Sequence, residues 1–227
     1  MKILPSFALA LLIALCSPFA LAAGSGGGSG PVPTTSGTTK TPEQIARAQY
    51  KYGLKQKDKA LRAQEKALAA TSDKQRAKFE KRARKAFAKA VDHHKKVLQA
   101  DPKHYKAANE LGYAMRKSGD FPGAVGAYNY ALQLKPDFLE AIEYRGEAFI
   151  NLGYFNEARK AYLRLYREDQ SLAVELMTAM TQWMERRSEQ AEPMNAAEQG
   201  FADWISERKR LVGFSINPNA AGRLGVW

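Results

Sequence analysis

The sequence has very few of the residues from which metal and redox sites are most often built. Its 227 residues include a single cysteine, Cys16, and three histidines, His93, His94 and His104. With one thiol, the chain forms neither an internal disulfide bond nor a thiolate metal cluster. His93 and His94 are adjacent, so on a helix their side chains point about 100° apart and do not share a metal ion. The composition therefore predicts no metal site.

Catalytic motifs are also missing. The sequence contains no glycine-rich phosphate loop, no HExxH zinc motif and no serine in a nucleophile elbow. Acidic pairs such as Glu140 and Glu143 occur, but pairs of this kind are common on solvated helices. We therefore predict no catalytic residue, no cofactor and no enzymatic activity, and an enzyme of unrecognised type remains the alternative.

One markedly apolar stretch lies near the N-terminus. Phe7 to Cys16 is apolar but too short to span a bilayer as a stop-transfer helix, and Lys2 precedes it. Ala20-Leu21-Ala22 supplies small residues at the −3 and −1 positions of a cleavage site. These features predict a signal peptide over residues 1–22, a periplasmic or secreted protein, and no transmembrane segment after cleavage.

Removal of this leader changes the chemistry of the mature chain. Cys16 leaves with it, so the mature protein has no thiol and no cysteine nucleophile. One alternative is that the segment is retained as an N-terminal anchor. The other is a lipoprotein modified at Cys16, which Leu15 disfavours because the residue before a lipidated cysteine is normally small.

The chain after the leader begins as a linker and then becomes helical. Residues 23–40 consist mainly of Gly, Ser, Pro and Thr, which predicts a flexible linker. At Thr41, the sequence Thr-Pro-Glu-Gln provides an N-cap, a proline in the first turn and a capping-box glutamine, and a second such box begins at Ser72. We predict two long helices, one from about Pro42 to Ala69 and one ending near Gln99, paired as an antiparallel hairpin.

Apolar positions indicate how these two helices pack. Leu54, Leu61 and Leu68 recur every seven residues in the first helix and predict an apolar stripe. The same leucines alternatively form the seam of an oligomeric coiled coil, although so few heptads are thin evidence. The inward-facing residues predicted for the second helix are Phe79, Ala83, Phe87, Ala90, Val91, Val97 and Leu98.

Positive charge is concentrated in this hairpin. The formal net charge is +12, and residues 40–106 hold 20 Lys and Arg against seven Asp and Glu, whereas residues 107–227 hold 14 against 16. Such a surface attracts an anionic envelope polymer or lipid, while an exported protein seldom meets nucleic acid. The other interpretation is a merely solvated face. The cations predicted for this basic surface are Lys55, Lys59, Arg62, Lys66, Lys78, Arg82, Lys85 and Lys89.

A period of 34 residues runs through the middle of the chain. It relates Ala90 to Ala124 and Ala158, Pro102 to Pro136, Gly112 to Gly146, Gly119 to Gly153, Phe121 to Phe155, and Tyr128 to Tyr162. Such a period is typical of stacked helical hairpins. Helices are predicted to begin at Asp101-Pro102, at Asp120 and at Pro136-Asp137. His94 occupies the register of Tyr128, which predicts a packing role for it.

The residues at these positions resemble the tetratricopeptide repeat family, whose consensus is Trp-x2-Leu-Gly-x2-Tyr followed by Ala-x3-Phe, Ala and Pro. The first full repeat has Ala108, Leu111, Gly112, Met115, Ala124, Tyr128, Ala131 and Pro136 in these slots. The second has Ile142, Arg145, Gly146, Phe149, Ala158, Tyr162, Leu165 and Gln170, and it departs from the consensus at Arg145 and Gln170. The resemblance covers about residues 83–170.

The resemblance implies an all-α protein, a tetratricopeptide-like superhelical stack of helix-turn-helix units with a long N-terminal basic hairpin. Two amphipathic helices after the repeats, the second with a capping signature at Asn195, predict a terminal cap. The predicted segments are a signal peptide (1–22), a linker (23–40), the hairpin with a degenerate first repeat (41–100), two repeats (101–170), capping helices (171–212) and an irregular tail (213–227).

The resemblance also implies a binding groove, because in this family the first helix of each pair lines the concave face. The corresponding residues are Lys106, Asn109, Tyr113, Arg116, Lys117, Glu140, Glu143, Tyr144, Glu147 and Asn151. Glu140, Glu143 and Glu147 share one helical face, which predicts an acidic groove for a basic and apolar peptide or helix. A solvated face is the alternative. The implied function is an exported protein-binding scaffold, with envelope assembly or secretion as a hypothesis.

Overall fold

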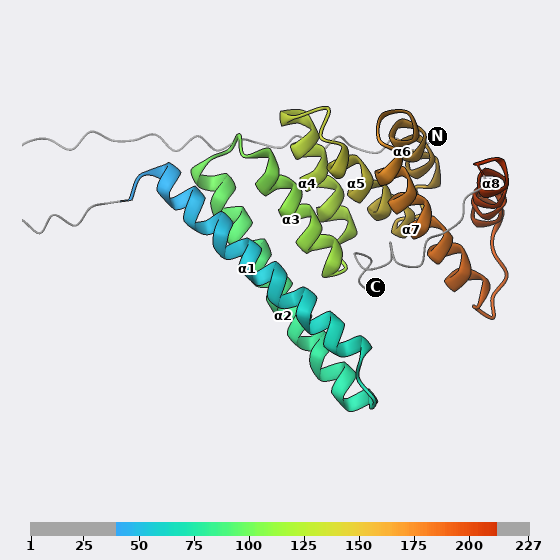
Figure 1. Ribbon diagram of the computed structural model, residues 1–227, viewed down its shortest axis with the longest axis horizontal. Helices are drawn as coiled ribbons and strands as arrows, with labels where there is room; N and C mark the ends of the chain where they lie inside the picture. The colour runs from blue at the N-terminus through green and yellow to red at the C-terminus, as the bar shows by residue number, and fades with distance from the viewer. Residues whose placement is uncertain (1–39, 213–227) are drawn as a thin grey trace, which may run out of the picture. The chain divides into compact units, whose positions relative to one another are not determined.

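The computed structural model describes residues 40–212, which fold into eight α-helices (Figure 1). The helices are α1 (Pro42–Leu68), α2 (Asp73–Ala100), α3 (Tyr105–Lys117), α4 (Phe121–Leu134), α5 (Leu139–Asn151), α6 (Phe155–Glu168), α7 (Gln170–Ser188) and α8 (Ala196–Val212). Each helix packs on its neighbour in sequence, and α3, α5 and α7 also pack on one another in order. The predicted all-α, tetratricopeptide-like stack is confirmed. The predicted leader and tail lie outside the described residues.

Local sequence signals determine where several helices begin. The Gln44 backbone N–H donates to Thr41 Oγ1 at 3.3 Å, and the Thr41 N–H donates to Gln44 Oε1 at 3.0 Å, so the predicted capping box of α1 is confirmed. At α2, the Gln75 N–H donates to Ser72 Oγ at 3.4 Å, which is half of the predicted box. Asp120 caps α4 as predicted, since its carboxylate accepts a hydrogen bond from the Gly123 N–H at 3.0 Å.

The starts of α3 and α5 differ from the prediction. These helices begin at Tyr105 and Leu139, three residues beyond the prolines at which they were expected to open. Pro102 and Pro136 instead lie in turns that precede each helix. The His104 ring replaces the expected cap of α3, because its Nδ1 accepts a hydrogen bond from the Ala107 N–H at 3.1 Å. The predicted glycine turns are confirmed, since Gly119 and Gly153 have φ of 89° and 72°, a region that favours glycine.

The α1–α2 hairpin packs mainly through small residues, and the predicted leucine stripe is confirmed only in part, since Leu61 packs on the hairpin core whereas Leu68 does not. Leu68 is 57% exposed, and Leu54 and Leu61 are only partly buried. The buried residues of α1 are Ala46, Gly53, Ala60, Ala63 and Ala67. All of these except Ala63 recur every seven residues, and Gly53, Ala60 and Ala67 each directly precede one of the three leucines. Small side chains form the contact between α1 and α2 because they let the two backbones approach closely. On α2, Ala83, Phe87, Ala90 and Val97 are buried as predicted, while Phe79, Val91 and Leu98 are partly buried.

The closest approach within the hairpin repeats a contact of the stack. A Cβ added at Gly53 would lie 2.5 Å from the His94 ring, and one added at Gly112 would lie 2.6 Å from the Tyr128 ring. Both rings are fully buried, which confirms the packing role predicted for His94. The hairpin therefore has the glycine–ring contact of a repeat but much longer helices, and its turn end projects past α3 and α4 (Figure 1).

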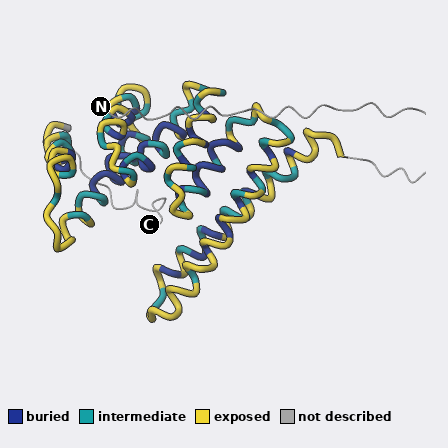
Figure 2. The backbone as a smooth tube through the Cα atoms, turned by 180° about the vertical axis from the view of Figure 1, so that it is seen from behind, coloured by how far each residue is buried: buried dark blue, intermediate teal, exposed yellow. Residues whose placement is uncertain are grey.

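The core continues through the stack and ends at α8. Tyr128 and Tyr162 are fully buried at equivalent positions of successive repeats. At the end, Phe201 and Ile205 of α8 are fully buried against residues of α6 and α7, as a terminal cap requires. Figure 2 shows buried backbone concentrated in the stack and the turn end of the hairpin mostly exposed. None of the helices within residues 40–212 combines the length and apolar character needed to cross a membrane.

Candidate functional site

The predicted groove contains a buried charged cluster. Arg116 on α3 and Glu143 and Glu147 on α5 are each no more than 2% exposed. Arg116 Nη1 donates to Glu147 Oε2, which forms a buried ion pair. Neither carboxyl oxygen of Glu143 has a hydrogen-bond partner, and burial, followed by the nearby Glu147 charge, raises its pKa well above the usual range. Burial therefore favours the neutral form of the Glu143 side chain beside the ion pair.

This burial corrects the prediction of an acidic groove. Glu140 is exposed, but Glu143 and Glu147 are enclosed, so the three glutamates do not form an accessible stripe. Their spacing places the latter two on the side of α5 that packs on α3 and α7. The partner of Glu147 is Arg116, which lies 31 positions earlier in the sequence. Both residues were among those predicted for the groove, but no local sequence pattern indicates that their side chains are in contact.

Aromatic rings from α3 and α5 surround this cluster. The Tyr113 and Tyr144 ring centroids lie 5.3 Å apart in an edge-on arrangement, and the Arg116 guanidinium lies over both. Lys57 of α1 lies 4.2 Å from the Tyr113 centroid and forms a 2.8 Å ion pair with Glu110. Burial raises the pKa of Tyr113 to about 12. Lys57 was absent from the predicted groove because the resemblance did not include α1 as a groove helix. Glu110 lies on α3, a predicted groove helix, but was not among the residues predicted there.

The remaining predicted groove residues lie apart from the cluster or at its edge. Lys106, Glu140 and Asn151 are exposed, and the Asn151 amide donates to the Glu147 carbonyl of its own helix at 2.9 Å. Asn109 is 4% exposed, and its Oδ1 has no hydrogen-bond partner. Lys117 is half-buried, and desolvation, together with the adjacent Arg116 charge, lowers its pKa to about 8.

A hollow of about 580 Å³ lies beside this cluster, between the hairpin and the α3–α4 turn. It is lined by Gln64, Ala67, Leu68, Arg76, Glu80, Ala83, Arg84, Arg116, Lys117, Ser118, Gly119 and Phe121. Apolar side chains from α1, α2 and α4 contribute to the lining, while four of the five charged residues are cations. No sequence pattern predicts this hollow, because its walls come from four helices whose approach no local pattern encodes. Arg116 and Lys117 of its lining were predicted groove residues, and Leu68 belonged to the predicted leucine stripe.

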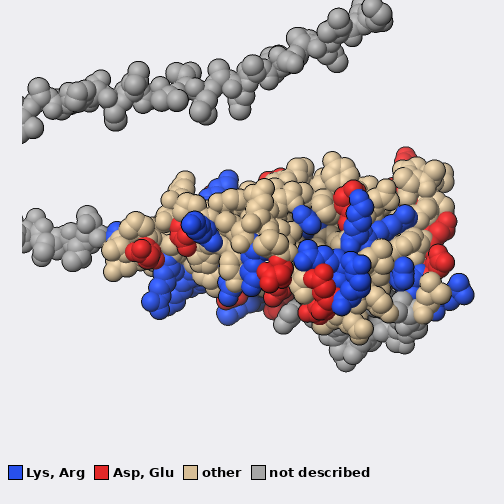
Figure 3. Space-filling view, turned by 90° about the horizontal axis from the view of Figure 1, so that it is seen from above, with Lys and Arg blue, Asp and Glu red and all other residues tan. Residues whose placement is uncertain are grey.

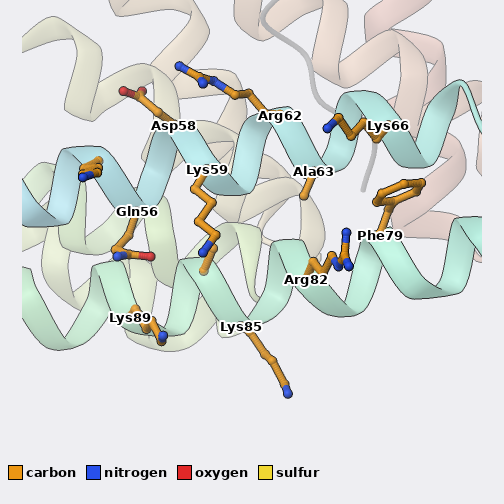
Figure 4. A pocket seen from close by; sticks show the side chains of 12 residues that line it. Gln56, Asp58, Lys59, Arg62, Ala63, Lys66, Phe79, Arg82, Lys85 and Lys89 are labelled. Carbon is orange, nitrogen blue, oxygen red and sulfur yellow. The ribbon is translucent and has the colours of Figure 1, made fainter.

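The predicted basic surface lines a second hollow, a groove of about 940 Å³ along α1 and α2 (Figure 4). Seven of its eight predicted cations line it, namely Lys55, Lys59, Arg62, Lys66, Arg82, Lys85 and Lys89, whereas Lys78 lies outside. Gln56, Asp58, Ala63, Phe79 and Ala86 complete the lining. On the face that Figure 3 shows, by contrast, Lys and Arg are interspersed with Asp and Glu. We call this hollow the basic groove.

The fold and its surfaces define a helical-repeat protein, a stack of helix pairs closed by a terminal cap. The tetratricopeptide repeat profile matches residues 81–137 and 116–173, the region from α2 to the start of α7. Residues 81–173 are therefore a region of tetratricopeptide repeats. Proteins of this fold are typically non-catalytic interaction scaffolds, which supports a role in protein–protein interaction. Among residues 40–212, no group of three His, Cys, Asp or Glu side chains is arranged to hold a metal ion.

Similar proteins include one curated relative and two solved structures. The peroxisomal targeting signal receptor of Candida albicans is 37% identical over 81 residues, which is 36% of this chain and 14% of that protein. The first tetratricopeptide domain of Spaghetti (RPAP3), bound to the HSP90 peptide SRMEEVD, is 23% identical with a TM-score of 0.36, over 68% of this chain and 95% of that one. MamA is 19% identical with a TM-score of 0.40, over 78% of this chain and all of that one.

Proposed function

We propose that this protein is a scaffold that binds a peptide segment of a partner protein in the hollow between the hairpin and the α3–α4 turn. The observation that carries the proposal is the lining of that hollow, which combines apolar side chains from three helices with a cationic rim. Ligand sites are typically concave and mostly apolar, with a few polar groups that fix orientation. The hollow is also adjacent to the groove face that tetratricopeptide repeats generally present.

The charge of the hollow reverses the partner chemistry that the sequence suggested. The glutamates expected to attract a basic peptide are buried, whereas Arg76, Arg84 and Lys117 line the hollow. Arg84 lies 4.0 Å from Glu80 in an exposed pair, which offsets its charge only weakly. The complementary partner is a segment with an apolar anchor for Leu68 and Phe121 and one or more carboxylates for the rim.

A peptide-display selection on the full chain tests this proposal. Selected peptides are expected to combine Asp or Glu with a large apolar residue. The Leu68→Asp variant, with a carboxylate in the apolar lining, and the Arg84→Glu variant are each expected to weaken their binding by about tenfold or more, since apolar anchors and close charge pairs dominate small interfaces. Affinity is measured by fluorescence anisotropy.

The matched control is Lys78→Glu, because it also reverses one exposed charge on α2 but lies outside both hollows. Unchanged helical circular dichroism confirms that each variant is folded. Peptides that bind Leu68→Asp and Arg84→Glu as tightly as the unmodified chain would exclude this hollow as their site. Substituting Glu147 is unsuitable for this test, since its carboxylate is buried against Arg116 and its loss would perturb the fold.

We further propose that the protein acts outside the cytoplasm, in envelope assembly or secretion. The support is the leader pattern of residues 1–22 in the sequence alone. The test is intact-mass measurement of the protein recovered from the producing cell and its medium. A mature form that begins at Ala23 in the exported fraction is expected, and full-length protein retained in the cytoplasm would contradict export.

A further inference from the structure

The lining of the basic groove is predominantly cationic. Seven exposed cations line it against one carboxylate, Asp58. Within the part of the chain that the structure describes, none of the seven forms an ion pair. Like charges held this close repel one another, and an anionic ligand relieves that repulsion. The groove is therefore suited to an anion.

Two parallel rows of cations repeat with the period of a helix. Lys55, Lys59, Arg62 and Lys66 follow one another at steps of four, three and four residues on α1, and Arg82, Lys85 and Lys89 do so at steps of three and four on α2. The α1 row extends over about 16 Å at 1.5 Å per residue, or three helical turns. In Figure 4, Lys59 points into the space between the two helices, whereas Arg62 and Lys85 point outward from opposite sides.

The floor of the groove is small and apolar. Ala63 is 8% exposed and Ala86 is 3% exposed, so no side chain rises between the two rows at these positions. Phe79 lies half-buried toward the turn end, with the Arg82 guanidinium 5.6 Å from its ring centroid. The aliphatic stems of the lysines add apolar surface below their charged ends. A ligand of this groove thus meets an apolar strip flanked by two charged rows.

We propose that the basic groove holds an acidic amphipathic helix of a partner protein, lying along α1 and α2 as a third helix. Its apolar residues contact the alanine floor and Phe79, and its Asp and Glu side chains, spaced one per turn on either side, pair with the two rows of cations. This is the arrangement of charges that flanks the seam of a coiled coil. The site and its partner are independent of the hollow beside α3 and α4.

The groove favours a helix over an anionic lipid or a flexible polyanion for two reasons. A bilayer surface meets the most protruding side chains and leaves a recessed floor uncovered, whereas a rod of helical width reaches that floor. A flexible polyanion gains nothing from the helical period of the cations. A helix with carboxylates at the same period aligns a charge pair at each turn.

The test uses a synthetic helical peptide of about 18 residues, five turns, with glutamates flanking a stripe of alanine and leucine. A second peptide of identical composition has its glutamates redistributed so that no amphipathic face forms. Inorganic polyphosphate and vesicles of phosphatidylglycerol with phosphatidylcholine serve as the other anions. Binding to the full chain is followed by fluorescence anisotropy for the peptides and by co-sedimentation for vesicles.

The decisive variants carry three lysine reversals each. The triple variant Lys59→Glu, Lys85→Glu and Lys89→Glu reverses the groove and is expected to weaken binding of the helical peptide by about tenfold or more. The control Lys78→Glu, Lys81→Glu and Lys96→Glu changes the net charge equally from exposed positions outside the groove and is expected to weaken it by no more than about threefold.

Three results would each overturn the proposal. The first is failure of the helical peptide to bind the unmodified chain. The second is an equal loss with the two triple variants, which would show a general charge effect. The third is binding of the redistributed peptide, polyphosphate or vesicles as tight as that of the helical peptide and with the same dependence on the groove lysines, which would show a site for anions of any shape.

Discussion

The state of a single residue in this protein depends on neighbours that are distant in the sequence. Glu143 and Glu147 are one turn apart on α5 and equally buried, but only Glu147 pairs with Arg116. Glu143 has no hydrogen-bond partner for either oxygen, and its raised pKa follows from burial and the adjacent Glu147 charge. Two residues of one type on one helix therefore have different partners and different electrostatic surroundings.

These two glutamates are expected to respond oppositely to replacement by glutamine. The folded-state pKa of Glu143 is raised, so folding above the unfolded pKa of this group requires proton uptake, and that cost increases with pH. Glu143→Gln removes this cost and should raise the free energy of unfolding at pH 7. Glu147→Gln removes the carboxylate opposite a buried guanidinium and should lower it by about 3–5 kcal/mol.

Urea unfolding followed by circular dichroism measures both changes. Measurements at pH 5 and pH 7 distinguish the two variants further, because the stabilisation by Glu143→Gln should be smaller at the lower pH. Equal destabilisation by the two variants would show that Glu143 is ionised and shares the pairing of Glu147 with Arg116.

At the scale of elements, the period of the small residues determines how helices pair. The caps and turn residues predict the first two helices close to their observed limits, because these signals act within a few positions. The leucine period predicts the buried face of α1 less well, because alanine and glycine form most of that face. Glycine is favoured over any larger residue at position 53, because the ring of His94 occupies the space that a Cβ would need.

The Gly53–His94 contact makes hairpin packing sensitive to acid. Burial, then the charges of Lys57, His93 and His104, lowers the pKa of His94 to about 4, and the Tyr50 ring packs edge-on at 5.7 Å between centroids. The unfolded chain binds a proton near pH 6.5 but the folded chain does not. Stability is therefore lost as the pH falls from about 6.5 toward 4, by about 2 kcal/mol between pH 7 and pH 5.

The variant His94→Leu, which cannot titrate, isolates this effect. Between pH 7 and pH 5, the free energy of unfolding of this variant is expected to fall by about 2 kcal/mol less than that of the unmodified chain. This difference does not depend on how stable the variant is at pH 7. The measurement is the urea midpoint and slope at each pH. The same pH dependence in both proteins would assign the acid sensitivity to other groups.

At the scale of the whole molecule, the described residues form a linear series of contacts closed by a cap. Each helix packs mainly on its neighbours in sequence, so stability in one region is only locally coupled to another. The cap depends on Phe201, which is fully buried and stacked on Phe155 at a centroid distance of 4.5 Å. Its ring also lies 5.1 Å from that of Trp183.

Removing this ring is expected to loosen the C-terminal end alone. Phe201→Ala should lower the free energy of unfolding of the cap by about 3–5 kcal/mol. Amide hydrogen exchange should then increase in α8 and the second half of α7, while α1 to α4 remain protected. A uniform increase from α1 to α8 would show instead that the stack unfolds as one cooperative unit.

The sequence by itself determined the helical class, the 34-residue period, the caps of α1 and α4 and the concentration of cations in the hairpin. These features depend on residues a few positions apart or on a strict repeat, so no knowledge of distant contacts is needed. Even the basic groove was largely predictable, because seven of its cations lie at helical spacing on two adjacent helices.

Only the tertiary structure decided which charged residues face solvent. The predicted acidic groove is wrong because Arg116 and Glu147 are 31 residues apart and meet only when α3 packs on α5. The hollow beside Leu68 likewise requires α1, α2, α3 and α4 together. Burial depends on what packs against a side chain as well as on its type, and for helices far apart in the sequence that information exists only in the folded molecule.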